Sequence, residues 1–270
     1  MSTYNPSRAY GLVIYTDDYD GEAHRFFIYN FKGWRVSTST AHYIESKTAS
    51  PNLHQRLARE VMEQSAELGP SNVEVMGNQL SRNSAKMITF GTLVEALRTG
   101  FPDLTDDEYE AVKAFMLDFL GGLGTVRPGE IGLLSVSQRQ RVRNTSVVDQ
   151  AVMWHAYIRL AARFMEDKAD WGKALLVLKE PYTFEEGDRK WSGDLFSRDN
   201  PVWAQCGVIA PGKKGPRVVN NRESRQGAFE FLCQISGIAP RRDWLDKLID
   251  QGRAAGRKID NEQLKEGAGE

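Results

Sequence analysis

The side chains of this sequence that could do acid–base or metal chemistry are few and scattered. Adjacent acidic pairs, such as Asp106-Asp107 and Glu185-Glu186, point to different sides of a helix or strand, so we expect them in solvent. No GxSxG nucleophile motif occurs. The histidines have neither HxH nor i, i+4 spacing: His24, His42, His54 and His155. The sequence therefore predicts no catalytic residue, metal or cofactor, and its signal for an enzyme is weak.

Binding of phosphates is better supported, because basic residues cluster in three segments. The first is a polar loop with Arg82 and Lys86. In the second, SQRQRVRN, Arg139, Arg141 and Arg143 alternate along the chain. An extended backbone would place these three guanidinium groups on one face, which suits a row of phosphates.

The third basic segment lies on a predicted hairpin and the start of the helix after it. Glycine and proline at 211–216 predict the turn, Asn220 or Asn221 caps the helix, and Gly237 ends it. A helix N-terminus surrounded by cations favours anions, although an exposed turn also favours lysine and glycine without any ligand. The basic residues of this segment are Lys213, Lys214, Arg217, Arg222 and Arg225.

The three segments could form one groove or remain three separate surface patches. The net charge is −1, so any attraction for nucleic acid must come from such a local patch and must weaken with salt. Trp34, Trp191 and Trp203 stand beside polar and basic residues. Tryptophans in such loops either stack on bases or fix the loop to the core.

Length and composition are those of a soluble globular protein. The chain has 270 residues, of which 41% are hydrophobic and 26% charged. No apolar run approaches the roughly 18 residues that span a bilayer, and the N-terminus lacks the features of a signal peptide. Cys206 and Cys233 have no CxxC spacing and are expected in the core. We therefore expect a cytoplasmic protein without a membrane partner.

The order of elements predicts an α+β fold. Strands at 9–15 and 25–30 precede helices, and a long helix from 145 to 166 carries His155 in its apolar stripe as a packed core residue. The glycine-rich segment 121–132 lacks the residues of a P-loop and is expected to be a connection. We predict an N-terminal α/β lobe at 1–100, a mainly helical region with a β-hairpin at 101–250 and a flexible tail at 251–270.

Six segments follow one another in a distinctive order: FFIYNFKGWRVSTS, LHQRLAREVMEQSAELG, LSRNSAKMITFGTLVEAL, RNTSVVDQAVMWHAYIRLAARF, RDNPVWAQCGVI and VVNNRESRQGAFEFL. Their order resembles the DGQHR-domain family, which includes the DndB-like regulators of DNA phosphorothioation. The resemblance covers about residues 9–238, and no single motif is diagnostic. It implies a partial ParB-like N-terminal lobe and a helical C-terminal region.

The chain departs from the family at the motif that gives the family its name. Asp20 to Arg25 read DGEAHR, with one extra residue and immediately before the FFIYN strand, where the family has its motif well upstream. The insertion changes which side chains share a face. The resemblance then implies a shortened relative without the motif segment, and any catalytic activity of that segment is in doubt.

The resemblance implies a DNA-binding regulatory or accessory protein of a bacterial or phage DNA-modification or defence system, with DNA and a protein of that system as partners. The basic residues of the three segments would contact the DNA. One alternative is a nucleotide-dependent enzyme with a degenerate ParB-like site around Asp20, His24 and Arg25. Another is a protein-interaction module whose basic faces meet an acidic partner.

Overall fold

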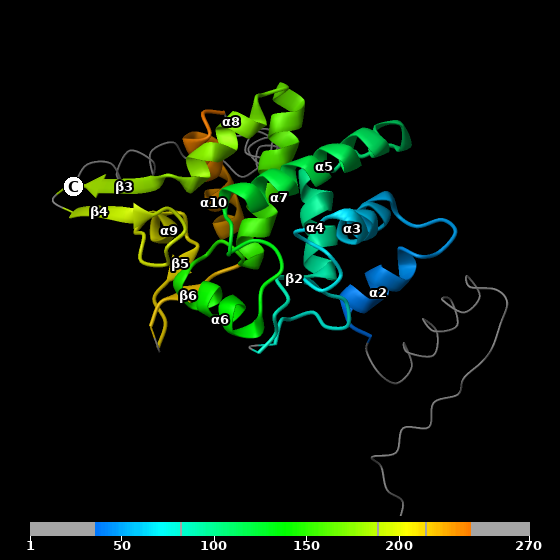
Figure 1. The fold of residues 1–270 in the computed structure, drawn as a ribbon, viewed down its shortest axis with the longest axis horizontal. Helices are drawn as coiled ribbons and strands as arrows, with labels where there is room; N and C mark the ends of the chain where they lie inside the picture. The colour runs from blue at the N-terminus through cyan, green and yellow to red at the C-terminus, as the bar shows by residue number, and fades with distance from the viewer. Residues whose placement is uncertain (1–35, 82, 188, 214, 239–270) are drawn as a thin grey trace, which may run out of the picture.

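The computed structural model describes residues 36–238 except 82, 188 and 214 (Figure 1). Several predicted features lie outside the described residues: the strands 9–15 and 25–30, Asp20 to Arg25, Trp34, Arg82, Lys214 and the tail 251–270.

The described chain is α+β, as predicted, with helices dominant and short strands in pairs. Within the described ranges, one pair is parallel, β1 (Val73–Glu74) with β2 (Ile88–Thr89). Two pairs are antiparallel hairpins: β3 (Pro181–Glu186) with β4 (Arg189–Asp194), and β5 (Ile209–Ala210) with β6 (Arg217–Val218).

Helix α7 (Ala151–Asp167) is the centre of the fold, between α4 (Phe90–Gly100) on one side and α10 (Arg222–Ile235) on the other (Figure 1). A helix covered on two sides must be apolar over most of its surface. The side chains of α7 are accordingly buried almost throughout its length, and His155 is one of them, as its position in the apolar stripe predicts.

Helices α2 (Thr38–Glu45) and α3 (Leu53–Gln64) pack on α4, and α5 (Asp106–Val126) packs on α3. One continuous hydrophobic cluster runs from Leu57 to Cys233 and includes α4 and α7. The predicted division of the chain near residue 100 stays a prediction.

The glycine-rich connection predicted at 121–132 is wrong in its first half, because α5 continues to Val126. Two glycines of this segment, Gly122 and Gly124, are places of close packing. A Cβ at Gly122 would lie 2.7 Å from the Trp171 ring, and one at Gly124 would lie 2.7 Å from the Glu67 side chain. Glycine lowers helix propensity, but here it lets neighbouring groups approach the helix backbone.

The predicted helix 145–166 begins later than expected and is preceded by another helix. Helix α6 (Val136–Thr145) ends where that helix was expected to begin, and α7 begins at Ala151 with Gln150 as its N-cap. Residues 146 and 147 lie alongside residues 196–197 instead: the Val147 amide donates to the Phe196 carbonyl at 2.9 Å. Long-range hydrogen bonds thus take up residues that the sequence assigned to the helix.

The β3–β4 hairpin was not predicted and extends away from the helices in Figure 1. It turns at Gly187, whose φ of 56° lies in the left-handed region. Two short helices lie on either side of the hairpin in sequence, α8 (Trp171–Leu176), which continues as a 3₁₀ turn (Val177–Lys179), and α9 (Val202–Gln205).

The hairpin predicted around the turn 211–216 is confirmed as β5–β6, and the helix predicted after it is confirmed as α10. Asn221 caps α10, and its side chain and that of Ser224 exchange hydrogen bonds with each other's backbone N–H groups. Gly237 follows the helix with a φ of 72°. Among the described residues, no helix combines the length and apolar character needed to cross a bilayer.

Two helix glycines give opposite predictions for the free energy of unfolding. A Cβ at Gly227 of α10 would overlap the Cys206 backbone carbonyl, so we expect Gly227→Ala to destabilise by about 1–3 kcal/mol. At Gly121 of α5 nothing lies within 4 Å, so Gly121→Ala should stabilise by about 0.5–1 kcal/mol. Urea unfolding measures both, and equal effects of the two substitutions would contradict the packing of α10 on Cys206.

Because His155 is buried, we predict that the free energy of unfolding falls in acid. Burial, followed by the charges of Arg225 and Arg159, lowers its pKa from 6.5 to about 3. The unfolded chain therefore binds this proton from about pH 6.5 downwards and the folded chain does not, so the free energy of unfolding falls as the pH falls through this window. Between pH 7.5 and 5.0 the free energy of unfolding of the wild type, measured with urea, should fall by about 1–2 kcal/mol more than that of His155→Leu. Equal losses in the two proteins would refute this assignment.

Candidate nucleic-acid interface

The β5–β6 hairpin and the start of α10 carry an exposed basic group. Lys213, Arg217 and Arg222 are all solvent-exposed, and Arg222 is the first residue of a 14-residue helix. The positive end of the helix dipole adds to these charges. Three of the five predicted cations of this segment are thus exposed on the hairpin and on the helix start that follows it.

Arg225, on the next turn of α10, is half-buried and bound within the protein. Its guanidinium lies 3.5 Å from the Glu95 carboxylate, and its Nε donates to Asn220 Oδ1 at 2.8 Å. Its charge is therefore partly neutralised, and its contacts fix Asn220 against α10 and α4.

The extended backbone predicted for Arg139, Arg141 and Arg143 is wrong, because these residues belong to α6. Ser135 and Gln138 form a capping box that starts the helix. At about 100° per residue, Arg139 and Arg143 share one face and Arg141 lies on another. Arg141 is exposed, Arg143 is half-buried, and Arg139 is completely buried.

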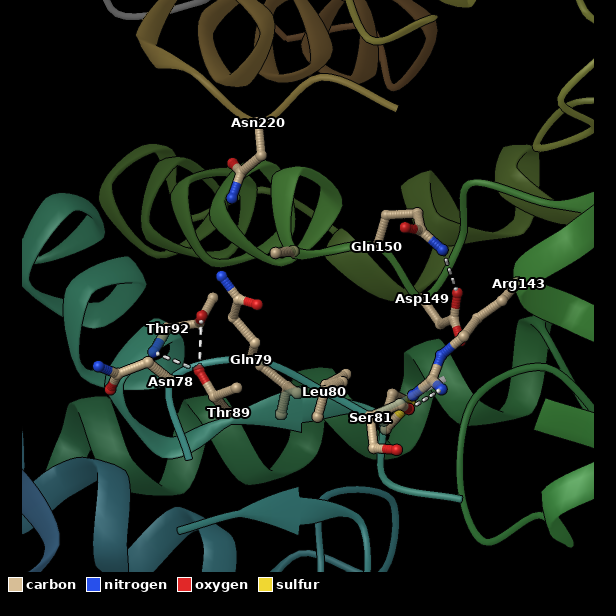
Figure 2. Close-up of a pocket in the computed structure, with 13 residues that line it drawn as sticks. Asn78, Gln79, Leu80, Ser81, Thr89, Thr92, Arg143, Asp149, Gln150 and Asn220 are labelled. Carbon is tan, nitrogen blue, oxygen red and sulfur yellow. Dashed lines mark hydrogen bonds and ion pairs between the residues drawn. The ribbon is translucent and has the colours of Figure 1, made fainter. Parts of the chain in front are cut away.

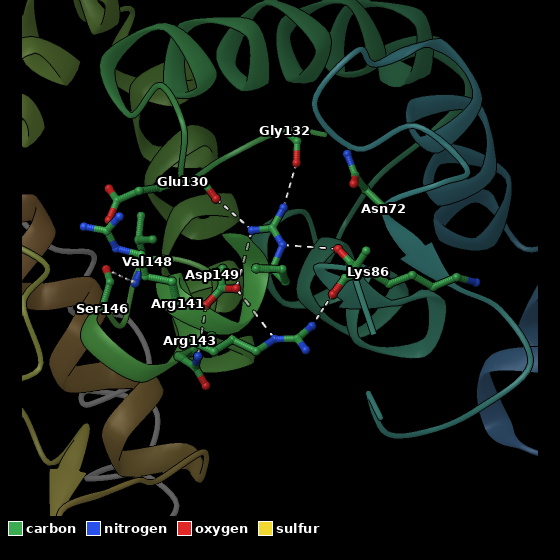
Figure 3. Close-up of polar contacts among 12 residues, drawn as sticks. Asn72, Lys86, Glu130, Gly132, Arg141, Arg143, Ser146, Val148 and Asp149 are labelled. Carbon is green, nitrogen blue, oxygen red and sulfur yellow. Dashed lines mark hydrogen bonds and ion pairs between the residues drawn. The ribbon is translucent and has the colours of Figure 1, made fainter. Parts of the chain in front are cut away.

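The buried face of α6 holds a polar network centred on Asp149 (Figure 3). The Asp149 carboxylate lies 3.4 Å from the Arg139 guanidinium and 3.8 Å from that of Arg143, and its side chain is fully buried. Burial raises the pKa of this carboxyl, and the two guanidinium groups oppose the shift. Burial likewise lowers the pKa of Arg139 and of Arg143.

Both arginines donate to backbone carbonyls of two loops. Arg139 donates to the carbonyl of Ala85 at 3.2 Å, and to those of Glu130 at 2.7 Å and Gly132 at 2.6 Å. Arg143 donates to the carbonyl of Ser84 at 2.9 Å and to that of Lys86. Guanidinium donors used in this way hold the loops in place and are not available for phosphates.

The loop residue Lys86 forms an ion pair with Glu74, with 3.3 Å between Nζ and Oε2. Trp203 lies in α9, is buried and donates from Nε1 to the Leu195 carbonyl at 2.8 Å, so it fixes this short helix to the core and does not stack on bases. Trp191 is half-buried and packs against the core.

A polar pocket of about 380 Å³ is lined by residues within or beside each of the three basic segments, and Arg143 is the basic side chain of that lining (Figure 2). Ser81 and Met87 on either side of the 82–86 loop line it, as do Arg143 of α6 and Asn220 between β6 and α10. The rest of its lining comes from around β2, α4 and α7: Asn78, Gln79, Leu80, Ile88, Thr89, Thr92, Asp149, Gln150 and Ala151.

Three helices begin at this pocket. Thr89 is the N-cap of α4, Gln150 is the N-cap of α7, and Asn220 precedes the N-cap of α10. The Thr89 side chain caps α4, whereas the first N–H groups of α7 receive no side-chain hydrogen bond from Gln150. A residue at or just before the start of each of these helices therefore lines the pocket, and helix starts favour anions.

Three amides of this pocket, Asn78, Gln79 and Gln150, were not predicted from the sequence. Each stands in a polar loop or at a helix start, and nothing in its local pattern separates it from other surface amides. Asn220 was expected only as a helix cap. Within the described residues, no three His, Cys, Asp or Glu side chains are grouped so that they could hold a metal ion.

Comparison with protein families gives a match, over residues 13–238, to the family DndB, described as DNA-sulfur modification-associated. The chain belongs to the DndB family. The predicted resemblance to DndB-like proteins is thereby confirmed, and the match covers most of this DndB-family chain. Comparison with curated proteins and with solved structures finds no match. The relation of Asp20 to Arg25 to the family's name-giving motif stays a prediction.

The two sides of α6 predict different roles for neighbouring arginines of this DndB-family chain. Arg139→Ala removes the closer guanidinium from buried Asp149 and leaves three partly buried carbonyls without their donor, so we expect a destabilisation of about 3–5 kcal/mol. Arg141→Ala, the matched control on the exposed side, should change the free energy of unfolding by less than about 0.5 kcal/mol. Urea unfolding distinguishes them, and a small effect of Arg139→Ala would show that the network does not hold the fold.

Proposed function

We propose that this protein binds DNA as a regulatory or accessory component of a DNA-sulfur modification system. Membership of the DndB family supports the association with DNA modification. The observation that carries the proposal is the polar pocket, whose lining comes from all three basic segments of the chain. Exposed cations stand on two of these segments, close in sequence to the residues that line the pocket, and exposed lysine and arginine side chains are what a phosphate backbone requires.

The exposed cations are the proposed phosphate contacts: Lys213, Arg217, Arg222 and Arg141. Lys86 and Arg225 contribute less, because each is already paired with a carboxylate. Arg139 and Arg143 act indirectly, because their guanidinium groups hold the loops around the pocket. Arg82 and Lys214, which lie outside the described residues, remain proposed contacts from sequence alone.

Positioning on DNA needs no chemistry from this chain, which accords with a regulatory or accessory role. To control gene expression or access to DNA, the protein needs only to bind DNA reversibly, with an affinity that partner proteins can change. A ParB-like N-terminal lobe and a role in a bacterial or phage defence system are further parts of the proposal.

The test is fluorescence anisotropy of labelled duplex and single-stranded DNA with the full chain, at about 50 and about 200 mM salt. Replacing Lys213, Arg217 and Arg222 by glutamate should weaken binding about ten-fold or more. The slope of log K against the logarithm of the salt concentration should become shallower by about 0.9 for each duplex phosphate that the variant no longer neutralises. The exposed positions of these residues make unfolding unexpected.

The control is a second triple variant with the same change in net charge, in which Lys168, Lys173 and Lys179 become glutamate. These residues are exposed at α8 and its flanks, and α8 lies on the opposite side of the molecule from β6 in Figure 1. It should keep the wild-type affinity. If both triple variants bind alike, the basic hairpin is not the contact. If the wild type binds neither DNA, the proposed function fails and an acidic protein partner becomes the explanation of the basic surface.

A further inference from the structure

The polar pocket contains hydrogen-bonding groups that the fold itself does not use. Among the described residues the Gln79 amide has no partner, and Figure 2 shows it directed into the pocket. Asn78 and Asn220 each use their side-chain oxygen, which accepts from the Ser39 amide at 3.0 Å and from Arg225 at 2.8 Å respectively. Their Nδ2 groups are donors held in fixed orientations. Gln150 uses its Nε2 on Asp149 at 3.0 Å, which leaves its oxygen as an acceptor.

The charges in the pocket are already balanced within the protein. Arg143 directs its N–H groups to the carbonyls of Ser84 and Lys86 and toward Asp149. Asp149 in turn is paired with two guanidinium groups. The ligand that matches such a site is a neutral, flat molecule with hydrogen-bond donors and acceptors along its edge, and is not a simple anion.

Nucleobases have this chemistry. Asparagine and glutamine are the side chains that pair with base edges through one donor and one acceptor, and pockets for unstacked bases combine such amides with an apolar surface. Leu80, Met87 and Ile88 supply apolar lining here. A volume of about 380 Å³ is at the small end of ligand sites and suits one base with its sugar.

The helix starts at the pocket suit the remainder of a nucleotide. The N-termini of α4, α7 and α10 face the pocket, and that of α7 has no side-chain cap. Backbone N–H groups at such a terminus bind phosphate, so a base in the pocket would have its phosphate beside a favourable electrostatic field.

We propose that this pocket binds a single nucleobase that DNA presents out of its stack, with Gln79 and Asn220 reading its edge from opposite walls. The inference rests on the proposed function and adds to it a place where the chain contacts a base in addition to the backbone. A free deoxynucleotide carries the same chemistry and is the other possible source of the base.

The test uses the full chain with a single-stranded oligonucleotide in which every adenine is 2-aminopurine, whose fluorescence rises when the base leaves its stack. Binding should raise the fluorescence. Gln79→Leu should abolish most of that rise while the anisotropy affinity falls only a few-fold, because the basic hairpin is unchanged. Asn220→Leu, on the opposite wall, should act in the same way. Gln234→Leu is the matched control, since Gln234 is an exposed glutamine of α10 that does not line the pocket.

A parallel titration with free dAMP distinguishes the two sources. DNA binding without a rise in fluorescence would overturn the base pocket and leave the proposed function intact. Binding of dAMP that is abolished by Gln79→Leu, in a protein that does not bind DNA, would support the nucleobase pocket and refute the proposed function. Failure to bind either DNA or dAMP would overturn both.

Discussion

The buried carboxylate of Asp149 is the interaction on which the site depends. It lies between two guanidinium groups from one face of α6, at a point where no solvent reaches it. Leaving any one of these charges without its partners in the interior would cost several kcal/mol, so the three groups are held in place together. Because Arg139 and Arg143 also take up carbonyls from 81–86 and 130–132, the same charges determine the paths of both loops (Figure 3).

Helix periodicity divides the basic residues of α6 between structure and surface. Residues four apart point inward and reach the loops, whereas the residue between them points to solvent. A basic run in a sequence therefore overstates the charge available to a ligand. The β5–β6 hairpin differs in this respect, because Lys213 and Arg217 are exposed there and have no buried acidic partner among the described residues.

Local signals predicted the parts of the fold that are set locally. Asn221 as a cap and Gly237 as a terminator could be identified because each acts on its own helix. The continuation of α5 through Gly122 could not, since the reason for glycine there is Trp171, far along the chain. The start of α7 was misplaced for a similar reason, because Val147 pairs with Phe196 and not with the following helix. The pocket is formed by residues 78–92, 143–151 and 220, so only the fold brings it together.

The convergence of three helix starts has an electrostatic consequence for the site. Each N-terminus carries roughly half a positive charge, and together with the buried guanidinium of Arg139 and the half-buried one of Arg143 the region would be strongly positive without Asp149. The single carboxylate offsets part of this field from within and accepts from Gln150, the N-cap of α7. A pocket whose charges are compensated in this way suits neutral hydrogen-bonding groups, whereas the backbone N–H groups of a helix start suit an anion. A nucleotide has the same division, with a neutral base and an anionic phosphate, which is why the proposed base pocket and the proposed phosphate contacts are compatible with one ligand.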